Sequence, residues 1–142
     1  MLITTPSFVS AAMLVLSSVA SVAADKCHVV GYIKDNTVWN PPGGGVIAGS
    51  QGMIFYKGDK EIHRWEQCDK CSGVCVDLKM VETPPLKEKF GWAAKCNGGQ
   101  FKECHGSYGG QPHIDGQKPQ NSGDFYGIGY EATSQCRMDF DC

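Results

Sequence analysis

The chain has little arginine and little net charge. Two of its 13 basic residues are arginines, and 15 acidic residues leave a formal net charge of −2 over 142 residues. Binding to a nucleic-acid backbone needs clustered lysine and arginine, so this composition argues against a nucleic-acid-binding protein. No apolar segment approaches the roughly 20 residues that a membrane-spanning helix needs. We therefore expect neither nucleic acid nor membrane among its partners.

Signatures of two large hydrolase classes are also missing. None of the four histidines lies in the His-Glu-x-x-His motif of zinc proteases. The segment around Ser50 approaches the Gly-x-Ser-x-Gly elbow of serine hydrolases, but Ala48 stands at the first glycine. We therefore assign no catalytic residue, no metal ligand and no cofactor.

The first 24 residues have the composition of an export signal. Residues 7–23 carry no charged side chain, their apolar centre spans 11–16, and small residues close the segment. This pattern is typical of a secretory signal peptide, cleaved after Ala23 or Ala24. We expect residues 1–24 to be this signal and residues 25–142 to form a single disulfide-rich secreted domain; a buried N-terminal helix is the alternative.

Eight cysteines are present, an even number spread over the expected mature chain. In an exported protein this pattern predicts four disulfides, which would stabilise a small core. Eight cysteines allow 105 connectivities, so the pairing stays open. The disulfide cysteines that we predict are Cys27, Cys68, Cys71, Cys75, Cys96, Cys104, Cys136 and Cys142.

The closely spaced Cys68, Cys71 and Cys75 have two other interpretations. Their Cys-x-x-Cys spacing suits a zinc site with His63 or His105 as a further ligand, and it also resembles a redox motif. Both alternatives suit a reducing compartment, whereas the expected signal peptide indicates an oxidising one. We therefore favour structural disulfides.

Apolar residues recur with the period of two that is typical of β-strands. We expect a hairpin from residues 53–56 and 61–65 around a turn at 57–60, and further strands at 28–33, 74–81 and 124–131. Residues 84–90 could form one or two helical turns. Glycine- and proline-rich segments at 40–45 and 105–123 read as long loops.

These patterns predict a mainly β fold. We expect a small, disulfide-stabilised antiparallel sheet, sandwich or barrel-like, with long Gly/Pro loops and at most one short helix.

A small secreted hydrolase is an alternative function. Strand alternation would place Glu61, His63 and Trp65 on one face and Arg64 on the other, so Glu61 and His63 could share a ribonuclease-type site that Arg64 does not easily join. A glycan-cleaving enzyme needs two carboxylates, which Asp59, Glu61 and Glu66 could supply.

A carbohydrate-binding module is another alternative, because exposed aromatic rings can stack on sugars. In small domains tryptophan is more often buried or half-buried, which disfavours this interpretation. The candidate rings are Trp39, Trp65, Trp92, Tyr108, Tyr126 and Tyr130.

A signal peptide, a mature chain of about 118 residues, eight cysteines and strand-type periodicity together resemble the small secreted cysteine-rich proteins of filamentous fungi. Many of those are effectors or avirulence proteins delivered to a host plant. The resemblance implies a secreted, non-enzymatic and monomeric protein that binds a host protein or a cell-wall component, outside host cells or after entering them. Residues 105–123 and 40–45, with nearby exposed aromatics, are then the expected contact regions.

Overall fold

The structure is a computed structural model that describes residues 25–40, 44–67, 71–126 and 129–142. Side chains are described in these ranges except at 36–40, 44–48, 124–126 and 129–130. The expected signal peptide, the centre of the 40–45 loop and Cys68 lie outside the described residues.

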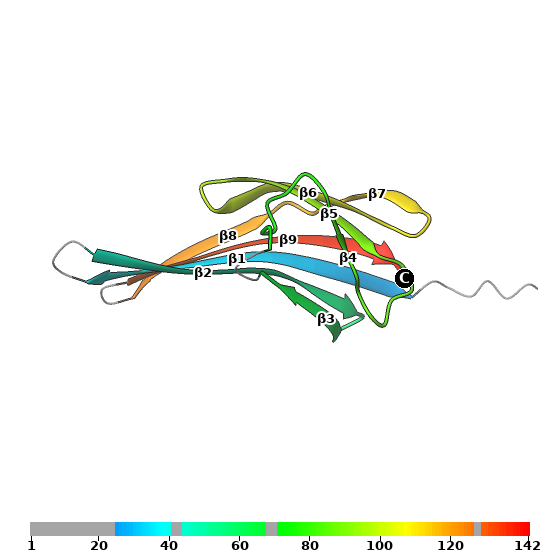
Figure 1. Cartoon of the computed structure of the whole chain (residues 1–142), viewed down its shortest axis with the longest axis horizontal. Coiled ribbons are helices and arrows are strands. Elements are labelled where there is room, and N and C mark those ends of the chain that lie inside the picture. The colour runs from blue at the N-terminus through cyan, green and yellow to red at the C-terminus, as the bar shows by residue number, and fades with distance from the viewer. Residues whose placement is uncertain (1–24, 41–43, 68–70, 127–128) are drawn as a thin grey trace, which may run out of the picture.

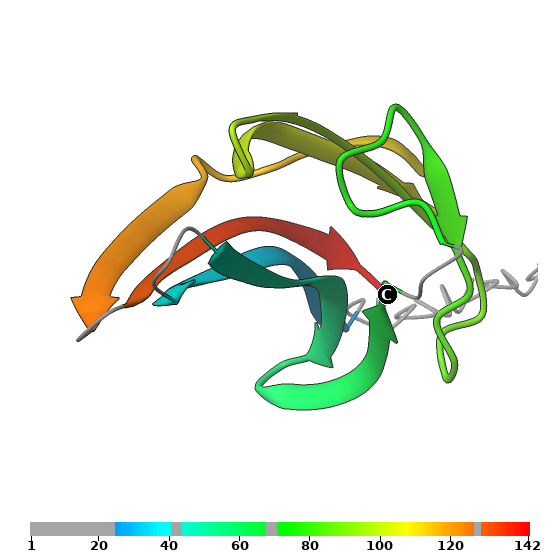
Figure 2. The same ribbon diagram turned by 60° about the vertical axis from the view of Figure 1, so that its left-hand side comes forward.

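The described chain folds into two antiparallel sheets that pack face to face, which confirms the predicted mainly β class (Figure 1). The five-stranded sheet has the order β3-β2-β1-β9-β8 and the four-stranded sheet the order β4-β5-β6-β7. Figure 2 shows them as separate layers, with the four-stranded sheet over one face of the other. The strands are β1 (Lys26–Asn40), β2 (Gly44–Lys57), β3 (Lys60–Glu66), β4 (Lys79–Val81), β5 (Phe90–Asn97), β6 (Gln100–Tyr108), β7 (Gln111–Asp115), β8 (Gln120–Tyr126) and β9 (Gly129–Asp141).

Alternation along β1 sets the inner face of the larger sheet. Val29 and Ile33 are buried, whereas His28 and Val30 point outward and are partly exposed. Strand β2 pairs with β1 in one direct register over its whole length, and its Met53 and Phe55 continue the buried face. The predicted hairpin between β2 and β3 is confirmed, with Lys57 opposite Lys60.

The core lies between the sheets and is rich in aromatic rings. Trp92 of β5 is fully buried, and its Nε1 donates a hydrogen bond of 2.8 Å to the carbonyl of Val74. Gly31 of β1 faces this indole, so the larger sheet has no side chain where the ring approaches it. Ser134 of β9 accepts a 2.8 Å bond from the backbone of Phe101 in β6, which joins the layers by a buried polar contact.

Three disulfides are described. Cys104–Cys136 joins β6 to β9 and so connects the two sheets, and Cys27–Cys142 joins the start of β1 to the last residue. Cys75–Cys96 fastens the segment before β4 to β5. Cys71 is also disulfide-bonded, so the seven described cysteines are all oxidised, as predicted.

Two local predictions before β5 are wrong. Residues 84–90 form no helix; Pro84 and Pro85 are joined by a cis peptide bond within a turn. Of the strand expected at 74–81, only Lys79–Val81 is a strand, because the preceding residues attach to β5 by isolated hydrogen bonds instead of a ladder. Among the described residues, no helix is long and apolar enough to cross a membrane.

The predictions for the last third of the chain also need correction. Residues 105–123, expected to be a loop, hold the end of β6, all of β7 and the start of β8. The strand expected at 124–131 is instead the end of β8 and the start of β9, which pair with Tyr126 opposite Gly129. Backbone hydrogen bonds form these strands although the sequence is poor in β-branched residues, so tertiary pairing outweighs local propensity.

Candidate functional site

Two large apolar side chains are exposed at the edge of the four-stranded sheet. Leu78 is 66% exposed and Met80 is 53% exposed, and they are the large hydrophobic residues found exposed in the described part of the chain. Strand register explains Met80: its neighbours Lys79 and Val81 pair with the inward-facing Trp92 and Phe90, so Met80 projects outward. One buried face therefore does not hold all four alternating apolar residues, Val74, Val76, Leu78 and Met80.

The segment before Met80 is firmly attached, so these apolar side chains sit on a fixed backbone. Gln51 of β2 accepts a 3.1 Å hydrogen bond from the Val74 amide, and the Val76 carbonyl accepts a 2.9 Å bond from the Ala94 amide. Val74 itself is fully buried.

Lys79 on β4 contacts Trp65 on β3, and so links the edge strands of the two sheets. Its ammonium lies 3.9 Å from the centroid of the Trp65 ring and contacts the Ser72 carbonyl. Partial burial lowers the pKa of Lys79, because desolvation disfavours the charged form. The cation–π contact and the carbonyl compensate that cost.

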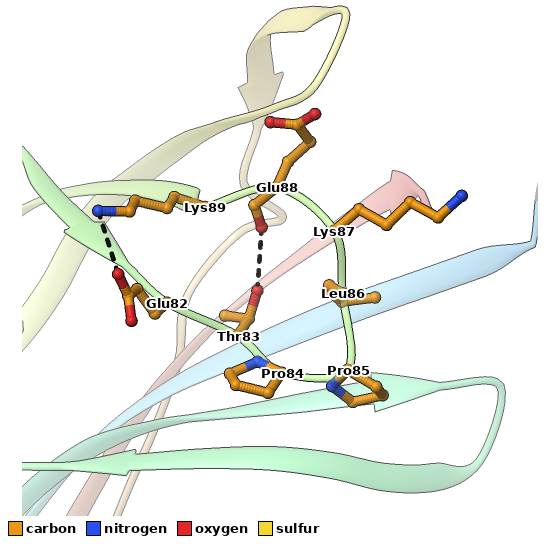
Figure 3. Close-up of a pocket in the computed structure, with 8 residues that line it drawn as sticks. All are labelled: Glu82, Thr83, Pro84, Pro85, Leu86, Lys87, Glu88 and Lys89. Atoms are coloured by element: carbon orange, nitrogen blue, oxygen red, sulfur yellow. Dashed lines mark hydrogen bonds and ion pairs between the residues drawn. The ribbon is translucent and has the colours of Figure 1, made fainter.

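Residues 82–89 form a compact loop (Figure 3), and part of it lines a hollow together with Met80. The Leu86 amide donates a 2.7 Å bond to the Thr83 carbonyl, and the buried Thr83 hydroxyl donates a 3.3 Å bond to the Glu88 carbonyl. Lys89 and Glu82 form an ion pair of 3.2 Å across the neck of the loop. These contacts fix the loop shape, so it presents a defined surface.

Two hollows border this loop. One of about 420 Å³ is lined by residues 82–89 themselves. The second, of about 520 Å³, is lined by residues 87–89 together with Met80, Ser107, Tyr108 and Gly109. We call Leu78, Met80 and residues 82–89 the β4 surface.

A third hollow, of about 410 Å³, lies on the outer face of the larger sheet. There His28 stacks on Tyr56 with ring centroids 4.7 Å apart, beside the ion pair of Arg137 and Asp139. Burial, followed by the charge of Arg137, lowers the pKa of His28. This hollow places an imidazole, whose neutral form is favoured by burial, beside two opposite charges.

The residues proposed for a hydrolase do not come together as predicted. A bulge between Phe55 and Tyr56 shifts the β2–β3 register, so Glu61 and Arg64 share a side after all. Arg64 donates to both carboxylate oxygens of Glu61, at 3.0 and 2.9 Å, and lies 3.8 Å from Glu66. The bond from Arg64 lowers the pKa of Glu61, which favours the ionised carboxylate.

The ring of His63 is instead close to the core. Its centroid lies 6.0 Å from that of Phe55, in a tilted arrangement. Ser50 lies within β2 and not in a turn between a strand and a helix, so it is not presented as a hydrolase elbow.

Most of the described aromatic rings that we proposed for stacking on sugars are not freely exposed. Trp92 and Tyr108 are buried, and Trp65 is half-buried beneath Lys79. The prediction that tryptophan is more often core is confirmed for Trp92. The side chains of Trp39, Tyr126 and Tyr130 are outside those described.

The described cysteines of the alternative zinc site, Cys71 and Cys75, are not free thiolates. Cys75 is bonded to Cys96, and Cys71 is disulfide-bonded as well, so neither can coordinate a metal as a thiolate. His63 lies on β3 and His105 on β6, in different sheets.

Sequence reasoning missed the β4 surface, because the alternation of residues 74–80 predicted burial. The adjacent prolines and four charged residues in 82–89 were the available signal for an exposed loop. Comparison of the chain with protein-family models, curated proteins and solved structures found no match.

Proposed function

We propose that the protein is a secreted, non-enzymatic binding protein that contacts a host protein through the β4 surface. The observation that carries this proposal is the exposure of Leu78 and Met80 beside a self-braced loop. Exposed apolar side chains clustered next to hollows and rimmed by charges are typical of protein contact sites. The charged rim is supplied by Glu82, Lys87 and Lys89.

The energetic contribution of such a contact is substantial. Burying a leucine or methionine side chain is worth about 1.5–3 kcal/mol, and the rigid backbone limits the ordering cost of binding. Removing one of these side chains should therefore weaken binding by roughly 10- to 100-fold. Because Leu78 and Met80 are exposed, the same change should leave folding stability within about 0.5 kcal/mol.

Two features support the rest of the proposal. Disulfides are typical of extracellular proteins, and three are described here. Arg64 lies between Glu61 and Glu66, so the guanidinium occupies the space that a substrate would need between two catalytic carboxylates. A host-directed, effector-type role follows the resemblance noted from the sequence.

The test uses purified, oxidised protein applied to plant leaf tissue, with cell death or defence signalling as the response. We expect the Leu78→Ser, Met80→Ser double variant to lose the response while its circular dichroism and urea midpoint stay unchanged. The matched control is Val30→Ser, an apolar-to-polar change on the outer face of the other sheet, which should keep it.

Two results would overturn the proposal. A double variant with full response would show that the β4 surface is not the contact. Cleavage of RNA or cell-wall glycans by the wild type, lost in His63→Ala, would show an enzyme instead.

A further inference from the structure

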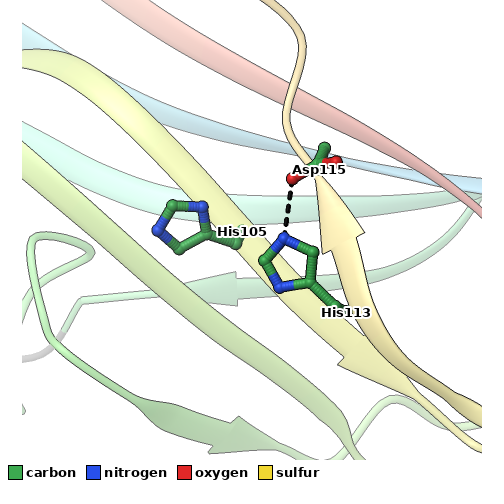
Figure 4. Close-up of side chains that lie close together, drawn as sticks. All are labelled: His105, His113 and Asp115. Carbon is green, nitrogen blue, oxygen red and sulfur yellow. Dashed lines mark hydrogen bonds and ion pairs between the residues drawn. The ribbon is translucent and has the colours of Figure 1, made fainter.

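The outer face of the four-stranded sheet carries a cluster of potential metal ligands. His105 lies on β6, and His113 and Asp115 lie on β7 (Figure 4). One ligand atom from each of the three residues lies within 4.8 Å of the others. The two imidazole centroids are 5.7 Å apart, and Nε2 of His113 is 2.7 Å from Oδ1 of Asp115.

A bulge in the β6–β7 hairpin creates this cluster. Tyr108 pairs with Gln111 across the turn, and in a regular ladder from that pair His105 would stand opposite Ile114. The observed shift between Gly106 and Tyr108 places His105 opposite Asp115 instead. Because a one-residue shift reverses the face of every side chain, the bulge brings His105 onto the same face as His113 and Asp115.

Contacts on the core side of the sheet anchor the backbone around the cluster. Cys104, next to His105, is bonded to Cys136, and its carbonyl accepts a 2.9 Å hydrogen bond from the Gly116 amide. Ile114, between the two β7 ligands, is buried in the core. The backbone at the ligand-bearing positions is therefore held by a disulfide, a hydrogen bond and core packing.

The residues next to His105 on β5 and β6 are a short side chain and an ion pair. Ala93 stands opposite His105 on β5, so the residue paired with that histidine has a short side chain. Glu103 lies 3.9 Å from Nε2 of His105 and pairs with Lys95 at 2.6 Å.

We propose that His105, His113 and Asp115 form a surface site for one divalent ion of the Zn²⁺ and Cu²⁺ class. Two imidazole nitrogens and one carboxylate oxygen are the donor set that such borderline ions prefer, whereas Mg²⁺ and Ca²⁺ prefer oxygen alone. Three protein ligands leave at least one coordination position open to water, as in zinc sites with Zn–N distances of about 2.0–2.1 Å. The ion takes the place of the His113–Asp115 hydrogen bond and links β6 to β7.

The test is a calorimetric titration of the oxidised protein with ZnCl₂ and separately with CuCl₂, with MgCl₂ as the hard-ion comparison. We expect one equivalent of Zn²⁺ or Cu²⁺ to bind and Mg²⁺ to give no heat. The His105→Gln and His113→Gln variants should each weaken binding at least 10-fold. His63→Gln is the matched control, since it removes a histidine from β3 in the other sheet, and it should leave binding unchanged.

A second readout locates the ion. In NMR spectra, substoichiometric Zn²⁺ should shift the imidazole signals of His105 and His113 and leave those of His28 and His63 in place. Unchanged binding in the His105→Gln, His113→Gln double variant, or shifts confined to His28 or His63, would overturn the proposal. Either result leaves the role of the β4 surface untouched, because the two sites share no residue.

Discussion

The contact between Gly31 and Trp92 gives the most direct test of how the two sheets pack. A Cβ atom at Gly31 would lie 2.5 Å from Cζ2 of Trp92 and 3.2 Å from Cζ3, and closer still to Cη2. Carbon atoms in proteins pack at about 3.5–4.0 Å. In Gly31→Ala, therefore, either the indole or the β1 backbone must move by about 1 Å.

Neither group moves easily. Trp92 is fully buried, and its Nε1 is bonded to the Val74 carbonyl, so displacing the ring breaks a buried hydrogen bond. Gly31 lies in the ladder between β2 and β9, where Met53 and Cys136 flank it. Overpacking costs about 1–3 kcal/mol, and this site combines overpacking with a threatened buried bond. We expect Gly31→Ala to lower the unfolding free energy by about 3 kcal/mol.

The measurement is urea unfolding of the oxidised protein, followed by tryptophan fluorescence. A loss of about 3 kcal/mol lowers the midpoint by roughly 1–3 M, given m-values of about 1–3 kcal/mol/M for small proteins. Gly110→Ala is the control, since nothing lies within 4 Å of a Cβ there. That substitution should leave the midpoint nearly unchanged.

A double-mutant cycle with Trp92→Phe isolates the contact. The smaller ring removes the carbons that meet the new methyl group, so Gly31→Ala should cost at least 1 kcal/mol less in the Trp92→Phe background. If Gly31→Ala costs the same in both backgrounds, or no more than Gly110→Ala, the proposed packing of β1 against β5 is wrong.

Three further predictions follow from the disulfides and from the partly exposed imidazole of His28. Replacing Cys104 and Cys136 by alanine should cost about 4 kcal/mol, because their bond closes a loop of 32 residues and joins the two sheets; a loss below about 1 kcal/mol in urea unfolding would contradict this. The lowered pKa of His28 means that the unfolded chain binds its proton more readily, so stability should fall as the pH drops through the ordinary histidine range. That slope, measured from urea midpoints between about pH 8 and pH 5, should flatten in His28→Gln; an equal slope in both proteins would refute the assignment. Unreduced protein should take up no iodoacetamide under denaturing conditions, and any adduct seen by mass spectrometry would reveal an unpaired thiol.

The predictable part of the fold is the first strand and the hairpin that follows it. Along β1, residues 28–33 are rich in β-branched and aromatic side chains, which predicts a strand, and Val29 and Ile33 are among its buried positions. The β2–β3 turn was visible too, because Gly58 adopts a positive φ of 58° that glycine tolerates without strain. Patterns of this kind predict strands but not their partners, so the two-sheet order could not be derived.

The alternation of residues 74–80 misled for a physical reason. Periodicity reports a face only while the chain stays in one regular conformation, and here the backbone is irregular between Val74 and Lys79. The isolated Val76–Ala94 hydrogen bond and the Cys75–Cys96 bond hold the chain to β5 without a continuous ladder. Val74 faces inward before the irregular stretch, whereas Lys79 and Val81 face inward after it. Met80, which lies between them, is therefore exposed.

The candidate metal ligands also come together through a change of strand register that the sequence does not reveal. The Gly109–Gly110 pair is a recognisable two-residue hairpin turn, and its regular continuation puts His105 on the face opposite His113. A reader of the sequence who found this hairpin would therefore have separated the two histidines. Pro112 lies in the irregular stretch of β7, an edge strand, and proline is tolerated in strands mainly at edges and bulges. The proline thus belongs to the irregularity that joins the ligands, and its meaning could be read only once the register of both strands was known.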